Sequence, residues 1–390
     1  MPETVQVNVD GAIAFVSINN PPVNATSLSV REGLLAAVND VQGCDLAVLT
    51  CEGRTFIAGG DMSEFDAPPV EPHLPDVIDA IENSATPFLA ILHGTVLGGG
   101  LEVAMACAFR VAKPGTRFGL PEVNVGLVPG AGGTQRAPRL LGWSAAVDMA
   151  CLGQMKSAED LRDLGAVDLI SDDPMAHVQD FVGRAYTKTS DRVVAAPMDR
   201  EAYLPKVQKA ARGRQGPLHN LEALSWATEP FSQAQPRERA LHLDLRSSAE
   251  SQALRHIFFA ERAAAKPKAL DQAQPLAIKR VAIVGGGLMG SGIAAACLNA
   301  DLAVTIIEQT EAAATQAAKT VTGLMQGALD RGKITASDFE ARCAALVTTT
   351  DYADAAEADL AIEAVFEDLN AKRTVFKDLS AVMRPDALLA

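Results

Sequence analysis

The stretch Gly98-Gly99-Gly100-Leu101-Glu102 follows an apolar run that predicts a strand, and it begins a segment that predicts a helix. Glycine at such a junction lets another molecule approach the backbone closely. The first N–H groups of a helix have no partner inside it, and the helix dipole adds to their preference for negative charge. A second donor could come from the loop Ile57-Ala58-Gly59-Gly60-Asp61. Two converging backbone N–H groups of this kind form an oxyanion hole.

Two glutamates accompany this stretch. Glu102 lies in the first turn of the expected helix, and Glu122 lies 20 residues further on, after Pro121, in a loop that follows another strand. Two carboxyl groups near one oxyanion hole can divide acid and base catalysis between them. Each feature alone is more often structural, since a glycine triplet allows close packing and a first-turn glutamate suits the helix dipole. Their joint occurrence, in this order, indicates a catalytic site.

The first half of the chain repeats a pattern of strand, loop and helix. Alternating apolar residues on both sides of Asp10-Gly11 predict a hairpin with a two-residue turn. Such a repeat favours an α/β fold of stacked ββα turns. From about residue 198 onward helical periodicity replaces the strand signal, and 266–275 predicts a linker. The elements expected after the hairpin are a helix over 28–41, a strand over 46–50, a helix over 76–83, a strand over 88–92, a helix over 99–108 and a strand over 109–112.

A second glycine-rich turn, Gly285-Gly286-Gly287-Leu288-Met289-Gly290, lies between an apolar strand and a helix. The strand over 303–307 then completes a βαβ unit within about 30 residues, as a Rossmann-type dinucleotide-binding unit requires. In this context Gly285 permits the tight turn, Gly287 admits a pyrophosphate and Gly290 allows the helix to pack closely. A glycine-rich turn without a ligand is the alternative interpretation.

Glu308 ends the strand that follows this turn, 18 residues after Gly290. Its carboxylate would accept a hydrogen bond from a ribose 2′-hydroxyl and would repel a 2′-phosphate. The pattern therefore predicts NAD rather than NADP as the cofactor.

Composition limits the classes of function. A chain of 390 residues is expected to form two or three domains, and its net charge of −14 argues against nucleic acid and anionic membranes as partners. The histidines show no metal-ligand spacing and the cysteines form no CxxC pair, so no metal site is predicted. Several cysteines lie in apolar runs and predict buried thiols. No signal peptide and no membrane-spanning run are visible, so the sequence predicts a cytoplasmic protein.

Residues 1 to about 190 resemble the crotonase superfamily of enoyl-CoA hydratases and isomerases. The matching stretches are Phe56-Ile-Ala-Gly-Gly-Asp61, His93-Gly-Thr-Val-Leu-Gly-Gly-Gly-Leu-Glu102 and the run from Phe118 to Gln135. The resemblance implies a spiral of ββα turns and an oxyanion hole made by the N–H groups of Gly60 and Gly99. It also implies that Glu102 and Glu122 are the catalytic carboxylates.

The presence of both carboxylates favours hydration of a trans-2-enoyl-CoA within this family. The resemblance implies that Gly60 and Gly99 hold the thioester oxygen. Glu102 would then activate water and Glu122 would deliver a proton to C2. The same pair could move a proton between C4 and C2, which leaves Δ3-Δ2-enoyl-CoA isomerisation open. A non-catalytic subunit that binds acyl-CoA or NAD is the rival from another class, and the retention of both glutamates argues against it.

Residues 279–390 resemble the N-terminal part of the 3-hydroxyacyl-CoA dehydrogenases. The matching stretches run from Lys279 to Ile293 and from Asp359 to Asp368. In that family the catalytic histidine and its glutamate partner lie further downstream. We therefore expect a fragment that binds NAD weakly at best and does not complete the oxidation alone. By this resemblance the residues that contact NAD are Gly285, Gly287, Leu288, Met289, Gly290, Glu308 and Glu363, the last on the nicotinamide side.

The two parts occur in the order of the bacterial multifunctional fatty-acid oxidation proteins, in which hydration precedes NAD-dependent oxidation of the 3-hydroxyl group. The expected substrate is an acyl-CoA thioester. A thiolase or further copies of the chain are open as partners. The expected domains are a crotonase-like domain over 1–190, a helical extension and linker over 191–277, and an incomplete Rossmann-type NAD-binding domain over 278–390.

Overall fold

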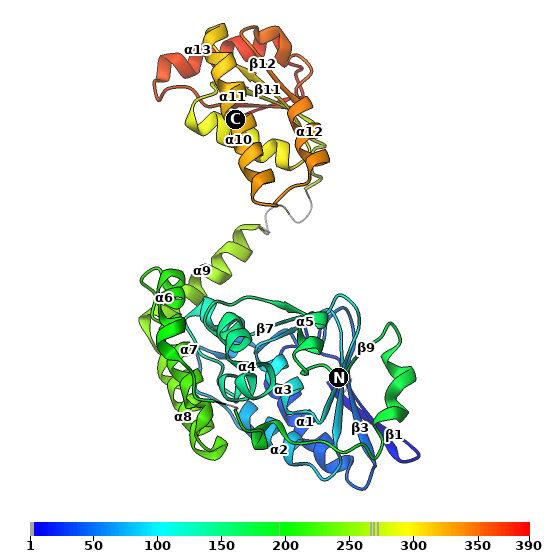
Figure 1. The fold of residues 1–390 in the computed structure, drawn as a ribbon. Coiled ribbons are helices and arrows are strands. Elements are labelled where there is room, and N and C mark those ends of the chain that lie inside the picture. The colour runs from blue at the N-terminus through cyan, green and yellow to red at the C-terminus, as the bar shows by residue number, and fades with distance from the viewer. Residues whose placement is uncertain (1–3, 195, 266, 268–269, 271–272) are drawn as a thin grey trace. The chain divides into compact units, whose positions relative to one another are not determined.

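The computed structural model describes residues 4–390 except 195, 266, 268–269 and 271–272. The chain divides into two compact units, Met1–Pro267 (unit 1) and Lys268–Ala390 (unit 2), which are drawn in Figure 1. Part of the linker predicted over 266–275 lies outside the described residues. The helices of the predicted extension belong to unit 1. They are α6 (Arg200–Ala211), α7 (Gly216–Ser225), α8 (Phe231–Arg246) and α9 (Ala249–Ala265).

A six-stranded sheet forms the centre of unit 1. From edge to edge its strands are β1 (Val5–Asp10), β2 (Ile13–Ile18), β3 (Leu46–Cys51), β4 (Phe88–Leu92), β6 (Phe109–Ala112) and β9 (Leu169–Ile170). The predicted hairpin joins β1 and β2 as antiparallel neighbours, although its two turn residues are Gly11 and Ala12 rather than Asp10 and Gly11. All other neighbours in this sheet are parallel. A smaller sheet contains β5 (Thr95–Leu97), β7 (Arg117–Gly119) and β8 (Lys156–Ser157).

Helices alternate with these strands, which confirms the α/β class. The helices predicted over 28–41, 76–83 and 99–108 are present with ends within two residues of the expected ones. In the extension, α7 packs against both α4 and α6, and α8 packs against α4 (Figure 1). The helices of unit 1 that precede the extension are α1 (Leu28–Asp40), α2 (Leu74–Asn83), α3 (Gly99–Ala106), α4 (Gly133–Ala150) and α5 (Ala158–Asp163).

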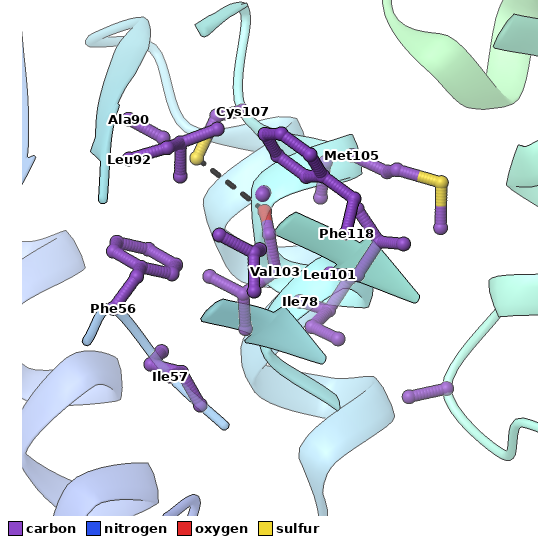
Figure 2. Packing of buried hydrophobic residues seen from close by; sticks show 14 of the residues in the cluster. Phe56, Ile57, Ile78, Ala90, Leu92, Leu101, Val103, Met105, Cys107 and Phe118 are labelled. Atoms are coloured by element: carbon purple, nitrogen blue, oxygen red, sulfur yellow. Dashed lines mark hydrogen bonds between the residues drawn. The ribbon is translucent and has the colours of Figure 1, made fainter. Parts of the chain in front are cut away.

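Helix α3 lies inside the hydrophobic core, and all eight of its residues are buried. Figure 2 shows Leu101 and Val103 of this helix among Phe56, from the loop after β3, and Phe118, from β7. A helix that is apolar on all sides is suited to such a position. Glu102 is the one charged residue of α3, so its carboxyl group is placed in the interior of unit 1.

Burial of cysteines is confirmed for Cys51, Cys107 and Cys151, all in unit 1. Burial raises the pKa of each of these thiols above its ordinary value, because a thiolate is poorly solvated in the core. The Cys107 thiol donates a hydrogen bond to the Val103 carbonyl oxygen at 3.4 Å (Figure 2). The partly exposed cysteines are Cys44, Cys297 and Cys343.

Unit 2 is built on a five-stranded parallel sheet, which confirms the expected Rossmann-type arrangement. Its strands lie in the order β12 (Leu346–Thr349), β11 (Ala303–Ile307), β10 (Arg280–Val284), β13 (Leu360–Glu363) and β14 (Leu388–Leu389). The glycine-rich turn leaves the central strand β10, between the strands that end near Glu308 and Glu363. The helices are α10 (Leu288–Asn299), α11 (Glu311–Asp330), α12 (Ala336–Ala344) and α13 (Leu369–Val382).

Candidate active site

Two loops meet at the start of α3. The Leu97 N–H donates to the Ile57 carbonyl oxygen at 3.0 Å, which ties the strand before α3 to the glycine loop. Gly98 has φ +51°, and a Cβ there would lie 2.6 Å from Oε1 of Glu122. A Cβ at Gly100 would overlap the Ile57 carbonyl. Glycine is therefore required at both positions, for a left-handed backbone at one and for close approach at the other.

The N–H groups of Gly60 and Gly99 are the expected oxyanion donors. Both residues line one cavity of about 490 Å³, together with Glu102 and Glu122. Among the described residues, neither N–H donates a hydrogen bond. The structure thus brings together the four residues predicted as catalytic, while the roles assigned to them stay predictions.

Glu102 is held by the backbone that begins α4. Its Oε1 atom accepts hydrogen bonds from the N–H groups of Ala131 and Gly133, each at 2.8 Å. Burial raises the pKa of this carboxyl above its ordinary value. The two N–H donors and the positive charges of Arg136 and Arg239 act in the opposite direction and favour the ionised form.

Glu122 lies in a short 3₁₀ helix, Pro121–Val125, and is held differently. Its Oε2 atom is buried and has no hydrogen-bond partner among the residues that the structure describes. Burial, followed by the nearby charges of Glu102 and Glu238, raises the pKa of Glu122 well above its ordinary value. The two environments therefore hold a proton more strongly on Glu122 than on Glu102.

Helix α8 contributes residues that the sequence interpretation missed. Glu238 is fully buried and accepts hydrogen bonds from the N–H groups of Gly132 (2.6 Å) and Thr134 (2.8 Å) and from the Thr134 hydroxyl. His242 is buried beside Gly130, and its Nδ1 lies 2.7 Å from the Val128 carbonyl oxygen. Burial lowers the pKa of this imidazole to about 4, so it is neutral at physiological pH.

A signal for α8 existed in the sequence. Gln235, Glu238 and His242 recur at helical spacing, and all three are buried. The apolar residues Leu241 and Leu245 of α8 pack against a separate small cluster that contains Val128. A buried row of polar residues on a helix is unusual unless each has a partner.

The cavity combines an apolar lining with four arginines and with the acidic side chains of Asp61, Glu64, Glu102 and Glu122. The apolar lining residues include Phe65, Val70, Leu74, Val125, Leu127 and Phe258. The arginines that line it are Arg31, Arg239, Arg246 and Arg262.

The second candidate site lies at the glycine-rich turn of unit 2. Gly285 has φ +97°, and a Cβ there would lie 2.7 Å from the Ala364 carbonyl oxygen. A Cβ at Gly290 would overlap the Gly285 carbonyl, whereas one at Gly287 would meet nothing within 4 Å. The three glycines thus differ as the dinucleotide-binding pattern predicts: Gly285 makes the tight turn, Gly287 leaves the backbone open to a ligand and Gly290 allows the close helix contact.

Two acidic residues flank this turn. Glu308 accepts a hydrogen bond from the Gly286 N–H through Oε1 at 2.6 Å. Glu363 pairs with Lys372 at 2.8 Å and accepts from the Val365 N–H at 2.7 Å, and the Lys372 bond is the main cause that lowers its pKa. Leu288 and Met289 are highly exposed in the first turn of α10. The open approach at Gly287 and the carboxylate at the end of β11 fit an adenine dinucleotide.

Within the described parts of the chain, no cluster of three or more His, Cys, Asp or Glu side chains is arranged to hold a metal ion. A search of the same residues finds no helix with the length and apolar character of a membrane span.

Two family descriptions match the chain. Residues 8–200 match "Enoyl-CoA hydratase/isomerase", and residues 280–390 match "3-hydroxyacyl-CoA dehydrogenase, NAD binding domain". A solved structure of an enoyl-CoA hydratase/isomerase from Pseudoalteromonas atlantica T6c has a TM-score of 0.51 and 22% identity, and the match covers 66% of this chain and 97% of that one. At this identity the match shows the fold of unit 1 alone.

Curated relatives match along nearly the whole chain. The peroxisomal bifunctional enzyme of Danio rerio is 35% identical over 98% of this chain and 55% of its own length. The peroxisomal fatty acid beta-oxidation multifunctional protein AIM1 of Arabidopsis thaliana is 32% identical over 99% of this chain and 57% of its own length. The chain therefore spans a little over half the length of these relatives. The prediction of a cytoplasmic location is wrong, because these relatives are named as peroxisomal proteins.

Proposed function

The chain belongs to the multifunctional β-oxidation proteins that join an enoyl-CoA hydratase domain to a 3-hydroxyacyl-CoA dehydrogenase domain, and we propose that its unit 1 hydrates trans-2-enoyl-CoA thioesters. One observation carries the proposal. Glu102 and Glu122 line the same cavity as Gly60 and Gly99, whose N–H groups donate no hydrogen bond among the described residues, and Glu122 holds a proton more strongly than Glu102 does.

Binding of the substrate begins with the thioester oxygen. The Gly60 and Gly99 N–H groups would donate to this oxygen and withdraw electrons from the C2=C3 double bond, so that C3 becomes electrophilic. Negative charge on the oxygen grows as water adds, and the donors therefore bind the transition state more tightly than the substrate. Loss of one such donor typically costs on the order of 100-fold in rate.

Proton transfer would use the two carboxyl groups in complementary states. Glu102, ionised and held by two N–H donors, takes a proton from water while the water oxygen bonds to C3. The electron pair of the double bond moves toward the thioester, and protonated Glu122 delivers its proton to C2. The carboxyl groups end the step in exchanged states, and proton exchange with water restores them.

Unit 2 would supply the NAD site of the following oxidation. Gly285, Gly287 and the first turn of α10 would hold the pyrophosphate, and Glu308 would accept from the adenosine ribose. Bound NAD supplies a hydride acceptor for the 3-hydroxyl carbon. The dehydrogenase activity itself is proposed for the full-length protein, with Glu363 near the nicotinamide.

Isomerisation is the alternative activity and would use the same two carboxyl groups, since they could transfer a proton between C4 and C2 of a Δ3-enoyl-CoA.

We propose that the helical extension over 191–277 is part of the hydratase, because α8 and α9 contribute to the lining of the cavity. A thiolase or further copies of the chain as partners stay predictions.

The test is turnover of crotonyl-CoA by this chain with and without NAD. Hydration without NADH formation is expected, followed as loss of the enoyl-thioester absorbance. Turnover of a Δ3-enoyl-CoA without hydration would favour the isomerase. A chain that binds acyl-CoA but turns over neither substrate would indicate a non-catalytic binding subunit. NADH formation would contradict the expectation that this chain hydrates the substrate without oxidising the product.

Hydration is expected to slow as the pH rises through the raised pKa of Glu122. Glu122 must carry a proton to donate it, and because its pKa is raised well above the ordinary value it keeps that proton to a higher pH and loses it as the pH rises through the raised pKa. At low pH the rate is expected to fall as well, because Glu102 becomes protonated. A profile of kcat/KM from about pH 5 to about pH 10 measures both limbs, which belong to the coupled carboxyl groups jointly. A rate that still rises at the alkaline end would contradict Glu122 as the acid.

A further inference from the structure

The backbone at the start of α4 serves two carboxylates alternately. The N–H groups of Ala131 and Gly133 donate to Glu102, and those of Gly132 and Thr134 donate to Glu238. Glu102 comes from α3 and Glu238 comes from α8. Four successive peptide groups are therefore shared between two side chains from different helices.

This arrangement leaves the backbone little freedom. Gly132 has φ +100°, and a Cβ at Gly133 would lie 2.9 Å from Oε1 of Glu102 and 2.6 Å from the Pro129 side chain. Because each peptide unit is planar, rotating the Gly132 N–H also turns the carbonyl of Ala131 and shifts the units on both sides. The direction of the Glu102 donors thus depends on what holds their neighbours.

Further hydrogen bonds hold the Glu238 carboxyl group in place. The Thr134 hydroxyl donates to Oε2 of Glu238 and accepts from the Gln135 side-chain amide, whose nitrogen lies 2.7 Å away. The same amide donates to the Ala223 carbonyl oxygen of α7 at 2.9 Å. Glu238 is fully buried, and it does not line the cavity among the described residues. It can act on the reaction only through other groups.

We propose that Glu238 is a positioning residue for hydration: by accepting from the Gly132 and Thr134 N–H groups, it directs the Ala131 and Gly133 N–H groups onto Glu102. The inference rests on the proposed hydratase function. By this proposal the helical extension helps to orient the catalytic base Glu102, although α8 begins 129 residues after Glu102 in the sequence.

The charges of Glu102 and Glu238 also interact directly. Burial and then the charge of Glu102 raise the pKa of Glu238 to about 8. The charged and titratable groups that surround the pair come from several elements. They are Glu122 of the 3₁₀ helix, Arg136 of α4 with its partners Glu82 and Asp79 of α2, and Arg239 and His242 of α8.

The experiment compares crotonyl-CoA hydration by the whole chain and by Glu238→Gln. The glutamine amide has one acceptor oxygen, so it can accept from the Gly132 N–H or from the Thr134 N–H but not from both as Glu238 does. We expect kcat to fall by about 10- to 100-fold because Glu102 is then misplaced. KM is expected to stay within about threefold, since Glu238 does not touch the cavity. Thr134→Val removes the hydroxyl that donates to Glu238 and accepts from the Gln135 amide, but it keeps the Thr134 N–H, so it should also lower kcat, by a smaller factor.

Gln235→Leu is the matched control. Gln235 is buried on α8 one turn before Glu238, and its side chain makes no hydrogen bond within the described residues, so kcat should not change. A folded Glu238→Gln variant with wild-type kcat, or one that changes KM alone, overturns the inference. If that variant does not fold, unchanged kcat in Thr134→Val overturns it instead. Absence of hydration by the wild-type chain would reject the proposed function itself.

Discussion

Glu122→Gln is expected to lower kcat for crotonyl-CoA hydration by about 10²- to 10⁴-fold, the range usual for loss of a general acid. The amide cannot give a proton to C2, whereas the Gly60 and Gly99 donors remain in place to bind the thioester. Acyl-CoA affinity should therefore be retained. Steady-state kinetics and a binding titration with a saturated acyl-CoA measure the two quantities separately.

Stability should not explain the loss. The Oε2 atom of Glu122 has no hydrogen-bond partner in the described structure, and a neutral amide resembles the protonated acid that burial favours. Glu201→Gln, at an exposed position in α6, is the matched control and should be silent in both assays. Near-normal turnover in Glu122→Gln would remove the two-carboxylate mechanism.

Gly290→Ala is expected to weaken NAD binding by unit 2 below that of the unchanged chain, which the sequence predicts to be weak. The added methyl group would overlap the Gly285 carbonyl oxygen, so the turn that leaves β10 must move. The cost of such overpacking is roughly 3 kcal/mol, and the displaced turn no longer presents its N–H groups to the pyrophosphate. Calorimetric titration with NAD measures the affinity, and thermal unfolding measures the stability of the unit.

A control for this variant lies two residues away. Gly292→Ala places a methyl group on the same helix where nothing lies within 4 Å. It should keep NAD binding and stabilise the helix by about 0.5–1 kcal/mol. Equal NAD affinity in Gly290→Ala and Gly292→Ala would show that the close contact at Gly290 is not needed for the dinucleotide.

The parts of the molecule that could be predicted from sequence depend on local pattern. Gly98 to Glu102 and Gly285 to Gly290 carry their turn geometry in their own residues, and Glu308 follows at a fixed distance along the same βαβ unit. The starts of the helices at Leu28 and Gly99 were likewise predicted from the pattern of neighbouring residues, although the Leu28 N–H donates to Glu64, 36 residues away. Such features need no knowledge of which elements pack together.

Glu238 could not be found in this way. Its partners, the N–H groups of Gly132 and Thr134, lie more than 100 residues earlier and belong to the backbone, which every sequence possesses. Helical periodicity gives the face of α8 but not the element that covers it. The cellular location was predicted wrongly for another reason. Composition and thiol content do not specify a compartment, because targeting signals are short segments that receptors recognise.

The buried cysteines give the two units different chemical behaviour toward thiol reagents. Only a thiolate reacts at a useful rate, and Cys51, Cys107 and Cys151 are both inaccessible and held in the thiol form. Alkylation of these three therefore reports the opening of unit 1, and its rate at low reagent concentration gives the free energy of that opening. Cys44 of unit 1 and Cys297 and Cys343 of unit 2 are partly exposed and can react without unfolding, although burial raises the pKa of Cys297 and Cys343 and so slows their reaction. A single alkylation time course, read by peptide mass, can thus follow the unfolding of the hydratase part without interference from the nucleotide-binding part.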